Sequence, residues 1–144
     1  MTLWTANDPD AGRAGLTVSS TVVIDGDPGR VLGILDEESV LWEAVRRVGR
    51  FSVAPLTDAD RQLADRFAGL LPAPGGAFAG VEWRETDFGP VLAANDTWAG
   101  CRLDDARPMG WGLLVEGTIE QVEIGTTSNA PPLIHYRGRY GATD

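Results

Sequence analysis

Strand-type sequence occupies both ends of this chain, whereas helix-type sequence is confined to its middle. β-Branched and aromatic residues alternate with polar ones in runs bounded by Gly, Pro, Asn or Asp, which is typical of strands. In the second half these runs are 81–85, 91–93, 97–103, 112–124 and 133–140. In the first half they are 16–24, 31–35 and 51–54. The pattern predicts a mainly β fold with two helices in the middle of the chain.

The longest run also predicts a bulge. Its inward positions are Val115, Gly117 and Ile119, and then the parity shifts to Val122 and Ile124. One extra residue in a strand produces such a shift and increases the local twist. We therefore expect a bulge near Glu120 in a strongly coiled strand, as at the corner of a barrel.

Two helices are predicted between the strands. Ser39 is a favourable N-cap, and Gly49 follows the last apolar residue of the pattern. Thr57 and Asp60 have the spacing of a capping box for a second helix, which Gly69 ends. The following segment, 70–80, holds two Pro and three Gly and is predicted to be a functional loop.

The length of 144 residues predicts one domain. Residues 1–14 are rich in Gly, Pro and Asp, with Trp4 as their large apolar side chain. We expect them to form an N-terminal arm that lies over the domain at 15–144.

Composition excludes several classes of function. The chain has 12 basic and 21 acidic residues, a net charge of −9 and no basic stripe, so nucleic acid is not an expected partner. Every basic residue is Arg, which excludes a Schiff-base lysine and the P-loop lysine. One Cys and one His cannot form a disulfide within the chain or the usual zinc sites. We expect Cys101 to be a structural thiol and no metal to be bound.

No stretch approaches the ~18 apolar residues of a membrane span, and the chain does not start with the pattern of a secretory leader. The sequence therefore predicts no membrane association and a cytoplasmic location.

Three groups of polar residues are candidate ligand contacts, each with a structural alternative. The hydroxyls of Thr17, Ser19, Ser20 and Thr21 could hold a phosphate or a ring system, or could be the solvent side of a strand. Residues 36–39, three acids and Ser39, stand just before a predicted helix, where the free N–H groups of the first turn favour a bound anion. The same residues are also common at the start of an ordinary helix. The strand at 135–140 carries two Arg that could pair with a phosphate or offset the acidic surface.

Several strings, taken in order, resemble the flavin reductase-like family, the short FMN- or FAD-binding partners of two-component monooxygenases. They are Gly-Leu-Thr-Val-Ser-Ser at 15–20, 31–36 with Ser39, 48–53, 63–69, 78–81 with Trp83, and Tyr-Arg-Gly-Arg-Tyr at 136–140. The resemblance implies an FMN-binding split β-barrel of Greek-key-like topology. It also implies a homodimer with flavin near the subunit interface, NAD(P)H as co-substrate and a flavin-dependent monooxygenase as partner.

The same resemblance implies the binding residues but assigns no catalytic one. Thr17, Ser19, Ser20 and the adjacent Thr21 would meet the flavin ring and phosphate edge. Asp36 and Ser39 would lie by the phosphate or ribityl chain. Phe78, Arg137 and Tyr140 would close the site, where a nicotinamide would stack.

The chain departs from the family pattern at positions expected to contact the ligand. They are Thr21 and Val23 after Ser20, Glu37 and Glu38 in place of a basic pair, Leu41 in place of Thr, Ala54-Pro55 in place of Val-Asn, and Gly112 in place of His. Three functions therefore stay open. They are an NAD(P)H:flavin reductase, a non-catalytic protein binding flavin, deazaflavin or another flat anion, and a structural dimer whose pocket has closed.

Overall fold

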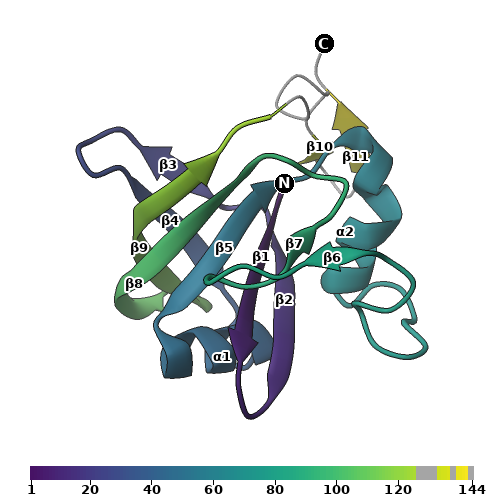
Figure 1. Cartoon of the computed structure of the whole chain (residues 1–144), viewed down its shortest axis with the longest axis horizontal. Helices are drawn as coiled ribbons and strands as arrows, with labels where there is room; N and C mark the ends of the chain where they lie inside the picture. Colours follow the sequence, from purple (N-terminus) through teal and green to yellow (C-terminus); the bar gives the residue numbers. More distant parts are fainter. Residues whose placement is uncertain (126–132, 137–138, 143–144) are drawn as a thin grey trace.

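A seven-stranded antiparallel sheet forms the body of the protein (Figure 1). The computed structural model describes the backbone of residues 1–125, 133–136 and 139–142, and the side chains through residue 125. In spatial order the strands are β2 (Gly12–Val18), β1 (Thr2–Asp8), β5 (Arg50–Pro55), β8 (Trp98–Met109), β9 (Gly112–Glu123), β4 (Arg30–Leu35) and β3 (Val22–Ile24). The predicted mainly β fold with two helices in mid-chain is confirmed.

The sheet curls on itself, so that β2 contacts β4 although four strands separate them in the sheet. Two irregularities in the long β8–β9 ladder accompany this curvature. Gly100 pairs with Gln121 and Cys101 with Ile119, which leaves Glu120 as the extra residue of a bulge. A second shift leaves Asp104 unpaired in β8. The bulge predicted near Glu120 is confirmed, and its bend helps to close the barrel.

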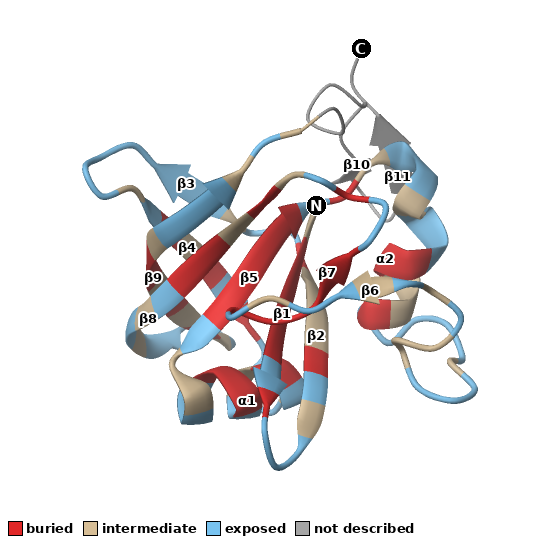
Figure 2. Ribbon diagram, in the orientation of Figure 1, coloured by how far each residue is buried: buried red, intermediate tan, exposed pale blue. Residues whose placement is uncertain are grey.

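The N-terminal segment corrects one prediction. Residues 2–8 are not an arm, because they form β1, which lies between β2 and β5 inside the sheet. Trp4 is completely buried and stacks on Phe51, with ring centroids 4.7 Å apart and planes at 10°. Its indole N–H donates to the hydroxyl oxygen of Thr21 at 3.0 Å. The first strand therefore supplies the centre of the core (Figure 2).

Two glycines create the space that the stacked rings occupy. A Cβ on Gly33 of β4 would lie 2.5 Å from Cζ2 of Trp4. A Cβ on Gly117 of β9 would lie 2.7 Å from Cζ of Phe51. Side chains at these two positions would collide with the rings, so the glycines are required by packing.

The first helix, α1 (Val40–Val48), packs against β1 and β2 at one end of the curled sheet. The Ser39 hydroxyl accepts from the Trp42 N–H at 3.1 Å, and Gly49 ends the helix with φ of +74°. This φ lies in the left-handed region that glycine adopts readily. Both predicted caps are confirmed.

The second helical segment begins as a 3-10 turn, η1 (Asp58–Asp60), and continues as α2 (Arg61–Phe67). The Asp60 carboxylate accepts from the Thr57 N–H at 2.8 Å, as the predicted capping box requires. Within the described part of the chain, neither α1 nor α2 has the length and apolar character to cross a bilayer.

Three strand predictions need correction. The run 16–24 is two strands, β2 and β3, which pair with different neighbours, so Ser19, Ser20 and Thr21 lie between strands. The strand predicted at 97–103 extends to Met109, because pairing with β9 continues to the hairpin turn. The strand predicted at 133–140 is instead two antiparallel strands, β10 (Leu133–Tyr136) and β11 (Arg139–Ala142). A further small hairpin joins β6 (Trp83–Arg84) to β7 (Val91–Leu92).

Candidate functional site

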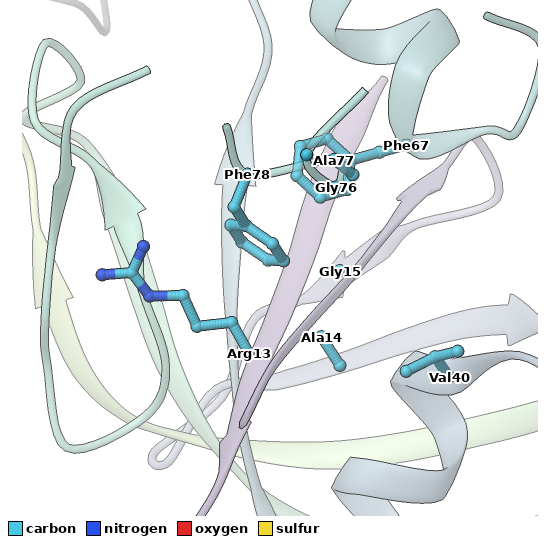
Figure 3. A pocket seen from close by; sticks show the side chains of 9 residues that line it. Arg13, Ala14, Gly15, Val40, Phe67, Gly76, Ala77 and Phe78 are labelled. Carbon is cyan, nitrogen blue, oxygen red and sulfur yellow. The ribbon is translucent and has the colours of Figure 1, made fainter. Parts of the chain in front are cut away.

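A cavity of about 430 Å³ lies beside β2, between the first residue of α1 and the loop predicted at 70–80 (Figure 3). Its lining is almost entirely apolar. The residues are Arg13, Ala14, Gly15, Val40, Phe67, Gly75, Gly76, Ala77 and Phe78. This volume lies within the range of roughly 300–1,000 Å³ that is common for small-molecule sites. The cavity is therefore our candidate functional site.

An aromatic cluster forms one wall of the cavity. Phe67 of α2 and Phe78 of the loop meet edge to face, with ring centroids 4.9 Å apart and planes at 76°. Trp83 meets Phe78 at 4.8 Å, and its indole N–H donates to the Phe78 carbonyl at 2.9 Å. The Arg66 guanidinium donates to the carbonyls of Ala77 and Ala79. These contacts fix the position of Phe78 although the loop has no regular secondary structure.

Gly15 lets the aromatic wall of the cavity pack directly on β2. A Cβ at this position would lie 2.7 Å from Cε1 of Phe67 and 3.2 Å from Cζ of Phe78. Any larger side chain would displace the aromatic rings or occupy the cavity. Glycine at residue 15 therefore lets the two rings that wall the cavity sit directly against β2.

Arg13 borders the cavity on the same strand. Its Nε donates to Oε1 of Glu85 at 2.8 Å, and its guanidinium carbon lies 5.9 Å from the Phe78 ring centroid. In Figure 3, Arg13 and Phe78 lie on one side of the cavity and Val40 on the other. A cation therefore stands at the edge of an apolar cavity.

Of the predicted binding residues, Phe78 lines the cavity and Thr17 lies beside it. Thr17 shares a face of β2 with Gly15, but its hydroxyl donates to the Ala64 carbonyl at 2.7 Å. Ser19 is exposed to solvent. The Ser20 hydroxyl accepts from the Ile34 N–H at 2.8 Å, which ties the link between β2 and β3 to β4.

Thr21 is directed away from the cavity and toward the core. Its hydroxyl oxygen accepts from the Trp4 indole and lies 2.6 Å from that of Thr2. The structure therefore brings only part of the predicted hydroxyl cluster near the cavity.

Asp36 and Ser39 build the start of α1. The Ser39 hydroxyl donates to the Asp36 carbonyl at 2.7 Å, and Oδ1 of Asp36 accepts from the Glu38 N–H at 2.9 Å. Since Val40 follows immediately and lines the cavity, this helix start borders the site. The side chains of Arg137 and Tyr140 lie outside the described residues.

Sequence reasoning missed Arg13, Gly15, Val40 and Phe67 as a group. Gly15 and Phe67 stood within the strings that carried the family resemblance, but neither was assigned a site role. Arg13 and Val40 carried no local signal, because only the packing of α1 and α2 on β2 brings them together.

Cys101 takes no part in this site. It is a free thiol, completely buried on β8, as expected of a structural residue. Burial, with smaller contributions from Glu120 and Asp104, raises the pKa of Cys101 to about 12. The thiol is therefore protonated and unreactive at neutral pH. Within the described residues no cluster of His, Cys, Asp or Glu could hold a metal ion.

The raised pKa predicts a pH dependence of stability. An exposed thiol of the unfolded chain ionises near pH 9, whereas the folded thiol retains its proton up to about pH 12. Stability should therefore fall as the pH rises above about 9, because only the unfolded state loses the proton. Urea denaturation between about pH 8 and about pH 10 should show this fall in the wild type and a smaller one in Cys101→Ala. Equal slopes in the two proteins would show that another group is responsible.

Comparison with known proteins gives a consistent set of similarities. The whole chain, residues 1–144, matches the family described as flavin reductase like domain. It is 30% identical over 138 residues to a flavin reductase of Pseudomonas putida, covering 95% of this chain and 78% of that protein. It is 33% identical over 134 residues to the FMN reductase (NADH) RutF 2 of Methylorubrum extorquens, covering 92% and 76%.

Among solved structures, nitrilotriacetate monooxygenase component B from Mycobacterium thermoresistibile superimposes with a TM-score of 0.86 and 26% identity. The match covers 99% of this chain and 78% of that one. The predicted split-barrel fold is thereby confirmed.

Proposed function

Because this chain belongs to the flavin reductase-like domain family, we propose that it is an oxidoreductase that transfers hydride from NAD(P)H to FMN. The observation that carries this proposal is the cavity beside Gly15. It is apolar, large enough for a flat ring system, and walled by the fixed aromatic ring of Phe78. The FMN reductase (NADH) of M. extorquens supports FMN and NADH as the pair used here.

The cavity residues fit a flavin better than a fully charged ligand. A ring with apolar faces would replace water against Phe67, Ala77 and Phe78, which favours binding through apolar burial. Arg13 offers charge at the rim rather than inside. When bound, the flavin itself supplies the redox chemistry, and the protein supplies binding and orientation.

The residues of this chain would act by positioning. Gly15 allows the rings of Phe67 and Phe78 to pack on β2 and wall the cavity. Arg66 and Trp83 hold the loop that carries Phe78. Within the described residues, the lining contains no Asp, Glu, His, Cys or Tyr that could exchange a proton at neutral pH. This agrees with a reaction in which hydride passes directly between the two bound molecules.

We further propose that the protein acts as a homodimer. Edge strand β3 exposes Val22, Val23 and Ile24, and the end of β9 exposes Val122 nearby. An apolar edge strand is a ready surface for pairing with another chain. Light scattering that gives twice the mass of 15.4 kDa would support this assignment, and a monomer would contradict it.

A flavin-dependent monooxygenase is the proposed consumer of the reduced flavin. This proposal is supported by the similarity to nitrilotriacetate monooxygenase component B, which is a component of a monooxygenase. The cytoplasmic location expected from the sequence stays a prediction.

One observation favours another of the three open functions, a structural dimer that has lost its flavin site. The hydroxyls of Thr17, Ser20 and Ser39 are all bonded within the protein, which leaves fewer donors for a cofactor. Such a protein would neither retain flavin nor oxidise NAD(P)H.

The deciding experiment is an absorption spectrum of the purified protein after incubation with FMN and desalting, followed by an NADH oxidation assay. Retained flavin with NADH oxidation supports the reductase. Retained flavin without oxidation of NADH or NADPH supports the binding protein. No retention, together with no tryptophan quenching during an FMN titration, would contradict both and favour a structural dimer.

A further inference from the structure

Arg13 is the one charged residue among those that line the cavity in the described part of the chain. It lies on β2, two residues before Gly15, so its side chain projects from the face of the strand that Gly15 also presents to the aromatic wall. Its guanidinium packs near the ring of Phe78. The cation is therefore placed beside the aromatic wall, where one end of a ligand in the cavity would lie.

The present partner of Arg13 is replaceable. Glu85 accepts from its Nε, and the two side chains are 38% and 50% exposed. Ion pairs this exposed to water contribute little free energy, because solvent screens them. A phosphate would offer the planar guanidinium fork more acceptor oxygens and more charge than one carboxylate.

The other edge of the cavity is unsuited to a phosphate. The turn that leads into α1 carries the exposed acids Asp36, Glu37 and Glu38 just before Val40, which lines the cavity. These carboxylates repel an anion, and the chain has a net charge of −9. The charge distribution directs the anionic end of a ligand away from the helix start and toward Arg13.

We infer that Arg13 binds a phosphate group of the ligand in this cavity, and that Glu85 competes with that phosphate for the guanidinium. This inference rests on the proposed function, since it concerns the same cavity. The phosphate belongs either to FMN or to the nicotinamide dinucleotide, and both present the same chemistry to Arg13.

The test compares FMN with riboflavin, which differs only in lacking the phosphate. Tryptophan quenching gives both affinities, because Trp83 contacts Phe78 at the cavity. If the phosphate is that of FMN, Arg13→Gln should weaken FMN binding about tenfold and leave riboflavin unchanged. Glu85→Gln should have the opposite effect and tighten FMN binding about threefold. If the phosphate is that of the dinucleotide, Arg13→Gln should instead raise the KM for NADH, with both flavin affinities unchanged.

Arg46→Gln is the matched control. It removes the same charge from an exposed arginine that pairs with Glu43 on α1 and does not line the cavity. An equal effect of Arg46→Gln would show that net charge alone is responsible, and would overturn the inference. It would also be overturned if Arg13→Gln changed neither FMN nor NADH binding while the wild type bound both. Failure of the wild type to bind FMN, riboflavin and NADH would instead refute the proposed function, and this inference with it.

Discussion

Replacing Trp4 with alanine is expected to lower the free energy of unfolding by about 4 kcal/mol. The side chain is completely buried, stacks on Phe51 and donates its N–H to Thr21. Removing it leaves a void between β1 and β4, because Gly33 cannot fill the space that the indole occupies. Urea denaturation followed by circular dichroism would measure the loss.

Trp111 provides the matched control for this substitution. It is fully exposed in the turn between β8 and β9, so Trp111→Ala should change the free energy of unfolding by less than about 0.5 kcal/mol. If Trp4→Ala does not fold, Trp4→Phe should fold with a smaller loss. A Trp4→Ala protein as stable as the wild type would show that β1 does not form the core.

Substituting valine for Gly15 is expected to weaken FMN binding by a factor of about 100 or more. A Cβ alone would lie 2.7 Å from Cε1 of Phe67 and 3.2 Å from Cζ of Phe78, and the two methyl groups of valine extend further. The side chain would push these two rings out of the positions in which they wall the cavity. Desalting after incubation with FMN, and tryptophan quenching, would measure the loss.

Gly15→Ala should weaken FMN binding less than Gly15→Val, since it adds only the Cβ and not the two further methyl groups. Gly29→Ala is the control, because Gly29 lies in a turn and does not line the cavity. The added Cβ would lie 3.5 Å from its nearest neighbour, the Ile24 carbonyl oxygen, which is an ordinary contact distance. A folded Gly15→Val protein that binds FMN like the wild type would place the flavin elsewhere.

Local features of the fold could be predicted from the sequence, because they depend on residues that are close together along the chain. Ser39 and Gly49 bound a helix through contacts with the adjacent turn. The parity shift around Glu120 marks a bulge because alternation along a strand records which face each residue occupies. Such signals do not need knowledge of the partner strand.

The position of β1 in the sheet could not be predicted in this way. Its strand is followed by a polar turn rich in Gly, Pro and Asp, so the whole N-terminal segment has the composition of an arm. Burial of Trp4 depends on Phe51, Gly33 and Gly117, which come from three other strands. Only the assembled sheet shows that these residues make one packing site.

The candidate site was likewise predictable from the sequence only in part. The sequence by itself determined a mainly β fold, the family resemblance, and a loop at 70–80 that includes Phe78. The tertiary structure decided which hydroxyls are engaged internally and that Arg13 and Gly15 face Phe78, because the site forms where β2, α1 and α2 meet. Contacts between segments so far apart along the chain have no local periodicity, so they are settled by packing rather than by pattern.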